Sequence, residues 1–205
     1  MPVEKHSDTP AAARLSTALR TTLRTAFATA AAAAALVGLG GCTPAFDWRS
    51  VRLPDSQLVT ELPCRPSRFQ RDVVVAGLPL KLFMLSCEAG GVTYGVATAD
   101  VRDPAQVDAV LFALRDSAVA AIRSANVRAR ALNVGGVTPF SGNSSVQLHG
   151  QRPDGETIDE SIRVFARGTR VFQASAVGLS LPEAALRPFE DGLRFDLEKP
   201  AAGPN

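Results

Sequence analysis

The sequence predicts an α+β fold: an antiparallel sheet of two meanders, with one long amphipathic helix between them and a short helix near the C-terminus. Two observations lead to this class. Apolar residues recur at three- and four-residue spacing between positions 103 and 124, which is typical of an amphipathic helix. Short apolar runs bounded by Gly, Pro and Asp lie on both sides of that stretch, which is typical of strands joined by tight turns.

The first meander is expected to contain strands at residues 72–76, 80–86 and 92–99. Residues 76–79 (Ala-Gly-Leu-Pro) provide the turn between the first two of these strands. Residues 80–85 are apolar at almost every position, which predicts a strand covered on both faces. That strand is therefore expected to belong to a sheet that is covered on each side.

The long helix has both a start signal and a core-facing stripe. Asp103 can cap its N-terminus, and Pro104 suits the first helical position. The apolar stripe predicts that one face of the helix packs on the sheet. Its members are Val107, Val110, Leu111, Leu114, Ala118, Ala121 and Ile122.

The second meander is expected at residues 127–133, 144–151, 157–166 and 170–177, with turns at 153–155 and 167–169. Residues 180–183 (Ser-Leu-Pro-Glu) have the pattern of a capping box, which predicts a short final helix. That helix is expected to be interrupted near Pro188 and to end at Gly192.

The order of these elements resembles a known family. A strand meander, a long helix, a second meander and a closing helix are similar to the PsbP-like or Mog-type α/β/α sandwich. The residues that carry the likeness lie at 92–97, 135–136, 171–174 and 189–195, and it covers most of residues 63–195. Members of that family are mostly non-enzymatic, so the resemblance implies a scaffold that presents surfaces to partners, although a fold alone does not fix function.

The N-terminus resembles a bacterial lipoprotein signal with a lipobox, Leu39-Gly40-Gly41-Cys42. Scattered arginines precede an alanine-rich apolar stretch that ends in small residues before the cysteine. The resemblance implies that residues 1–41 are removed and that Cys42 is lipidated, for example with palmitate. Because Thr43 is not the aspartate associated with inner-membrane retention, it also implies an outer-membrane protein facing the periplasm. An uncleaved anchor is the alternative, although a membrane span needs about 20 apolar residues.

The remaining chain divides into three expected parts. Residues 42–62 contain prolines and show no sustained period, so we expect a tether. Residues 63–197 are long enough for one α+β domain, and residues 198–205 are expected to be a disordered tail. Trp48, the chain's single tryptophan, suits either the membrane interface or packing against the domain.

The charge balance argues against nucleic acid as a partner. Residues 1–41 contain four Lys/Arg and two Asp/Glu of the 22 and 20 in the chain. The part after the signal is therefore formally neutral and offers no general attraction to polyanions.

Cys64 and Cys87 remain as an even pair once Cys42 is assigned to lipid. An oxidising compartment and the hairpin expected between them predict a disulfide, which should stabilise the fold by roughly 3 kcal/mol. A metal site is not expected, because no Cys-x-x-Cys motif occurs and His149 is the only histidine after the signal.

Residue types that support catalysis are scarce. His149 is expected on the strand face opposite Val146 and Leu148, and no Gly-x-Ser-x-Gly motif accompanies it. We therefore expect no enzyme and no cofactor. The sequence predicts a lipid-anchored envelope protein that binds a protein partner, with Arg163, Arg167 and Arg170 as the candidate surface. The alternative is a binder of small ligands, or less readily an enzyme, with a cleft between sheet and long helix.

Overall fold

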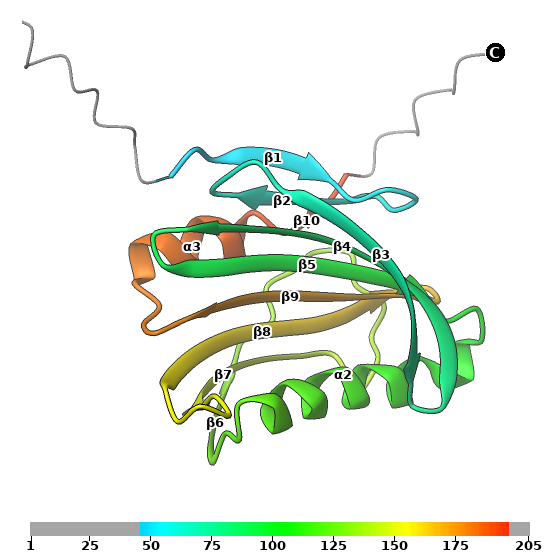
Figure 1. Ribbon diagram of the computed structural model, residues 1–205. Coiled ribbons are helices and arrows are strands. Elements are labelled where there is room, and N and C mark those ends of the chain that lie inside the picture. Colours follow the sequence, from blue (N-terminus) through cyan, green and yellow to red (C-terminus); the bar gives the residue numbers. More distant parts are fainter. Residues whose placement is uncertain (1–45, 197–205) are drawn as a thin grey trace, which may run out of the picture. The chain divides into compact units, whose positions relative to one another are not determined.

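The computed structural model describes residues 46–196, which form a mostly β structure with two antiparallel sheets (Figure 1). Of these residues, 49% lie in strands and 18% in helices. The larger sheet has seven strands in the order β3-β4-β5-β9-β8-β7-β6, and the smaller has the order β1-β2-β10. The strands are β1 (Arg49–Arg52), β2 (Leu58–Leu62), β3 (Ser67–Val75), β4 (Leu78–Ala89), β5 (Val92–Asp100), β6 (Asn126–Arg130), β7 (Ser144–Gln151), β8 (Thr157–Arg167), β9 (Arg170–Gly178) and β10 (Arg194–Phe195). The helices are the 3-10 turn η1 (Pro104–Gln106), α2 (Val107–Ala121) and α3 (Glu183–Asp191).

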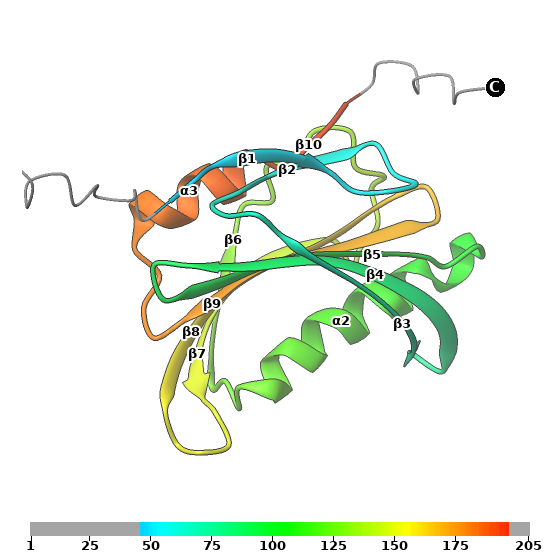
Figure 2. The ribbon, with the colours of Figure 1, turned by 45° about the horizontal axis from the view of Figure 1, so that its top comes forward.

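The predicted α+β class, with its PsbP-like α/β/α sandwich, is wrong. Strands before and after α2 belong to one sheet, because β5 pairs with β9 along its whole length from Val92↔Gly178 to Asp100↔Arg170. The helix therefore does not separate two meanders. One face of the large sheet carries α2, whereas the other carries the small sheet together with α3 (Figure 2). A β layer thus stands where the family resemblance implied helices.

The predicted tether at residues 42–62 is also wrong for the part that the structure describes. β1 and β2 pair antiparallel from Arg49↔Leu62 to Arg52↔Val59, and β10 joins the other side of β2. Pro54 and its neighbours form the turn of this hairpin and do not belong to a flexible linker. The sequence did not predict β2 because four of its five residues are buried, so the strand lacks the usual alternation of buried and exposed positions.

Two hydrophobic cores lie on the two faces of the large sheet. The first fills the space below the small sheet and α3 and is rich in aromatic side chains, which include Tyr94, Phe165, Phe172 and Phe189. The second lies below α2 and is mainly aliphatic. Because both faces are covered, β8 is buried at every position from Glu160 to Ala166.

Helix α2 confirms most of the predicted apolar stripe, although Leu114 is only half-buried and Ala121 is exposed. Val107, Val110 and Leu111 are fully buried, and Asp103 caps the preceding turn by accepting a hydrogen bond from the Ala105 N–H at 3.0 Å. The prediction for α3 was less accurate. No side chain caps its N-terminus, so the expected capping box does not form, and the helix continues through Pro188 to Asp191.

The disulfide between Cys64 and Cys87 is confirmed, with Cα atoms 5.9 Å apart. Cys64 follows β2 and Cys87 lies in β4, so the bond ties the small sheet to the large one. Trp48 packs edge-on against Tyr94, with ring centroids 6.4 Å apart, and stacks with Phe46. The packing alternative for Trp48 is therefore the one that the structure shows.

The predicted N-terminal signal, with Cys42, and the predicted disordered tail lie outside the described residues. Within residues 46–196, no helix has the length and apolar character needed to cross a membrane.

Candidate functional site

Strand β3 forms a long free edge of the large sheet. It pairs with β4 alone, in unbroken register from Ser67↔Ser86 to Val75↔Leu78. Seven of its nine residues are exposed, and the other two are half-buried. Two of the exposed side chains are large and apolar: Phe69 is 50% exposed and Val74 is 73% exposed. A regular edge of this kind offers unpaired backbone N–H and C=O groups to another strand.

The N-terminal part of β4 is not paired with β5. The two strands pair only between Phe83↔Thr98 and Ala89↔Val92, so residues 78–82 have β3 as their only strand partner. We call residues 67–82 the β3–β4 arm. Figure 1 shows the arm curving past the end of β5 toward α2.

A cleft of about 640 Å³ lies where the arm leaves β5. Pro54 and Asp55, at the tip of the β1–β2 hairpin, border it on the side of the small sheet. Three acidic and three basic side chains line it, together with smaller polar and apolar groups, and we call it the charged cleft. The charged residues are Asp55, Asp72, Asp100, Lys81, Arg102 and Arg170.

Asp100 organises the inner end of the charged cleft. Its carboxylate accepts hydrogen bonds from the Thr169 hydroxyl at 2.9 Å and from the Arg102 N–H at 3.0 Å. An Arg170 guanidinium nitrogen lies 3.9 Å from its other oxygen. Burial raises the pKa of Asp100, but these hydrogen bonds and the charges of Arg170 and Arg102 outweigh that effect, so the net pKa is lowered. Asp100 is therefore held as a carboxylate.

Most charges in the cleft keep unused hydrogen-bonding capacity. Within residues 46–196, the side chains of Lys81, Arg102, Asp55 and Asp72 make no hydrogen bond or close ion pair. Arg102 also has a φ of 67°, in the left-handed region that is uncommon for a residue with a long side chain. Unpaired charges and a strained backbone in one cleft are features that gather at binding sites.

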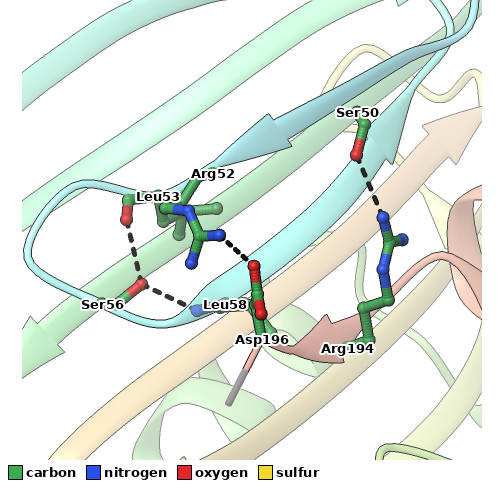
Figure 3. Close-up of polar contacts among 7 residues, drawn as sticks. All are labelled: Ser50, Arg52, Leu53, Ser56, Leu58, Arg194 and Asp196. Atoms are coloured by element: carbon green, nitrogen blue, oxygen red, sulfur yellow. Dashed lines mark hydrogen bonds and ion pairs between the residues drawn. The ribbon is translucent and has the colours of Figure 1, made fainter. Parts of the chain in front are cut away.

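The hairpin tip that borders the cleft is firmly held (Figure 3). Ser56 bridges the turn, because its hydroxyl donates to the Leu53 carbonyl and accepts from the Leu58 N–H. Arg52 pairs with Asp196 next to β10, and Arg194 donates to the Ser50 hydroxyl at 3.1 Å. The rim of the cleft is therefore a fixed part of the fold.

The three predicted partner-surface arginines do not form one open patch. Arg163 is only 9% exposed, and its guanidinium pairs with Glu190 at 2.6 Å, so it holds α3 on the sheet. Arg167 stacks over the Phe195 ring at 4.9 Å, and one of its terminal nitrogens is buried without a hydrogen bond to any group in residues 46–196. Only Arg170 borders the charged cleft. The prediction of an arginine surface failed because both faces of the large sheet are covered by other elements.

His149 lies on the face opposite Val146 and Leu148, as predicted, and its side chain is 61% exposed. Its Nδ1 atom lies 2.7 Å from an Asp159 oxygen, directly across the strand pair. A shallow cleft of about 350 Å³ adjoins both side chains. No serine or cysteine of the described chain makes a hydrogen bond to the His149 ring. The pair thus resembles an ordinary cross-strand contact.

A cleft between sheet and long helix, expected for the small-ligand alternative, is also present. It has about 650 Å³ and lies between α2 and the strands β6 and β7. Arg115 and Asp116, which help to line it, pair with each other at 2.8 Å. This cleft therefore offers fewer unpaired charges than the one beside the β3–β4 arm.

Glu160 is a buried carboxyl on the helix-covered face of β8. It is 6% exposed and, in the described part of the chain, has no hydrogen-bond or ion-pair partner for its side chain. Burial raises its pKa from 4.5 to about 7. In residues 46–196 no group of His, Cys, Asp or Glu side chains is arranged to hold a metal ion.

Sequence reasoning did not identify Lys81, Asp100 or Arg102 as site residues. These residues lie close together because β4 diverges from β5 and because β5 pairs with β9. Neither arrangement can be recognised from a short stretch of sequence. Comparison with protein-family models gives no match to this chain, and comparison with curated proteins gives none either.

Proposed function

We propose that this chain is a non-enzymatic, lipid-anchored envelope protein whose folded domain binds a protein partner by accepting an extended segment at the edge of β3. The single observation that carries the proposal is the unbroken, exposed edge of that strand. Backbone groups along such an edge give affinity to an added strand, and side chains on alternate positions give selectivity. The envelope location and the lipid on Cys42 come from the N-terminal signal pattern.

The exposed apolar side chains of β3 support the addition of a partner strand at this edge. Phe69 pairs in register with Met84 on the face that carries α2, whereas Val74 pairs with Pro79 on the opposite face. An added strand would cover part of both side chains, since cross-strand neighbours lie about 5 Å apart. Arg68 and Arg71 place positive charges along the same edge and favour a partner segment with acidic residues.

The experiment is photocrosslinking in intact cells from a reactive amino acid placed at Phe69 or at Val74. We expect one protein adduct shared by both positions, because both flank the same edge. Leu179 is the matched control position, since it is apolar and 62% exposed but lies outside β3. A second variant, Phe69→Glu, should abolish the adduct from position 74 and leave the circular dichroism of the domain unchanged.

Two results would contradict strand addition. One is an equal adduct from position 179, which would indicate random collision. The other is a persistent adduct in the Phe69→Glu variant. The anchor is tested separately: Cys42→Ala should remove palmitate labelling and shift the protein from the membrane fraction, and labelling that persists would disprove lipidation at Cys42.

A further inference from the structure

We propose that the charged cleft is a binding site for a short zwitterionic peptide of two or three residues with a free α-ammonium and a free α-carboxylate. This site lies beside the proposed partner edge but does not depend on it. The cleft brings three cationic and three anionic side chains together around about 640 Å³, a size that suits a small ligand. Its formal charge is zero, which fits a ligand with one charge of each sign.

The carboxylate end of the peptide belongs near Arg102 and Arg170. Within residues 46–196, the Arg102 guanidinium makes no hydrogen bond, and the Arg170 guanidinium has only its contact of 3.9 Å with Asp100. Both guanidinium groups therefore retain N–H donors for a carboxylate, and arginine can present two parallel donors to such a group. Asp100 fixes the backbone at Arg102 through the 3.0 Å hydrogen bond and so positions that side chain.

The ammonium end belongs near Asp55 and Asp72. Neither carboxylate has a hydrogen bond or a close ion pair within residues 46–196, although both line the cleft. Asp72 comes from the β3–β4 arm and Asp55 from the hairpin tip, so they approach the cleft from the two sheets. Lys81 lies directly opposite Asp72 across the strand pair, so this end of the cleft carries two carboxylates and one ammonium, and the net negative charge attracts a cationic group.

The spacing of the two charged ends sets the length of the ligand. Asp72 lies in β3 and Arg170 in β9, and two strands of the sheet lie between them. Paired strands lie about 4.8 Å apart, so the path along the sheet between their backbones is at least about 14 Å, because β4 is no longer paired with β5 at this level. Both side chains reach into that distance, and an extended peptide of two or three residues spans about 7 to 10 Å. A single amino acid is too short to contact both ends.

The test is isothermal titration calorimetry of the full-length protein in detergent with trialanine. We expect trialanine to bind, and N-acetylated or C-amidated trialanine to bind at least about tenfold more weakly, because each cap removes one charge. Free alanine should also bind at least about tenfold more weakly. Raised salt should weaken the binding, since both contacts are electrostatic.

Two substitutions assign the ends of the peptide to residues of the cleft. Arg102→Asn retains a residue type that tolerates positive φ, and Asp72→Asn keeps the side-chain shape. The first should weaken trialanine binding and narrow the difference between native and C-amidated trialanine, because only Arg170 then remains for the carboxylate. The second should narrow the difference between native and N-acetylated trialanine, because only Asp55 then remains for the ammonium. Arg187→Asn is the control, because that exposed residue lies in α3 and pairs with Glu183.

Three outcomes would overturn the proposal. The first is the absence of measurable trialanine binding at millimolar concentration. The second is equal affinity for capped and uncapped peptides, which would indicate nonspecific adhesion. The third is unchanged trialanine affinity in both cleft variants, which would place the peptide elsewhere on the protein.

Discussion

Replacement of Glu160 by glutamine should stabilise the protein in a strongly pH-dependent way. The Glu160 carboxyl is buried on the face of β8 that α2 covers, and its cross-strand neighbours Leu148 and Val177 are apolar. Burial disfavours the charged form and raises the pKa of Glu160 from 4.5 to about 7. Glutamine has nearly the same shape and carries no charge, so it removes this pH dependence.

The direction follows from proton binding in the two states. Between pH 4.5 and about 7 the folded protein retains the Glu160 proton, whereas the unfolded chain has released it. The free energy of unfolding therefore falls as the pH rises through this interval and is level above it. At 1.36 kcal/mol for each pKa unit, the total loss is up to about 3 kcal/mol. The lowered pKa of Asp100 acts below this interval and does not overlap with it.

The assay is urea unfolding followed by the fluorescence of Trp48, which packs on the first core. At pH 4.5 the Glu160→Gln variant should match the wild type, and near pH 8 it should be more stable by up to about 3 kcal/mol. Glu156→Gln is the control, because Glu156 is exposed in the neighbouring turn and should show no such trend. A Glu160→Gln variant with the same or lower stability than the wild type near pH 8 would refute the reasoning.

Three further predictions concern packing, covalent structure and chemistry. Gly150→Ala should destabilise the domain by about 2 kcal/mol or more in thermal unfolding, because the new Cβ would lie 2.0 Å from the Ile122 carbonyl oxygen. Gly135→Ala is the control and should be nearly neutral, because its new Cβ would meet nothing within 4 Å. Replacing both bonded cysteines with alanine should lower the unfolding free energy by about 3 kcal/mol, and an unchanged denaturation midpoint would contradict this value. His149→Ala should leave partner crosslinking and trialanine binding intact. A loss of either in a folded variant would show that His149 has a role in binding.

The sequence predicted the strands of the large sheet well where alternation and turn residues coincide. The expected segments 144–151, 157–166 and 170–177 correspond to β7, β8 and β9 within one residue at either end. Those boundaries depend on local chemistry, because glycine and aspartate specify the turns. The β1–β2 hairpin was missed because its strands are short, and Pro54 with Asp55 in its turn resembles linker composition.

The architecture and the candidate site depend on pairings between distant segments. No local pattern shows that β5 pairs with β9, yet this pairing joins the two expected meanders into one sheet and places Arg170 beside Asp100. The same limit explains Arg163. A charged residue in a strand suggests an exposed face, but the small sheet and α3 cover the face that carries Arg163, and Glu190 of α3 pairs with its guanidinium.

The two proposed sites should act independently, because they use different surfaces of the β3–β4 arm. Strand alternation places Asp72 on the side of the charged cleft, whereas Phe69 lies on the side of α2. Phe69→Glu should therefore abolish the partner adduct and leave trialanine affinity unchanged in calorimetry, while Asp72→Asn should weaken trialanine binding and leave the adduct from position 69 intact. If either substitution abolished both activities in a folded protein, the edge and the cleft would have to be one continuous site. A partner whose terminal residues enter the cleft would then explain both observations.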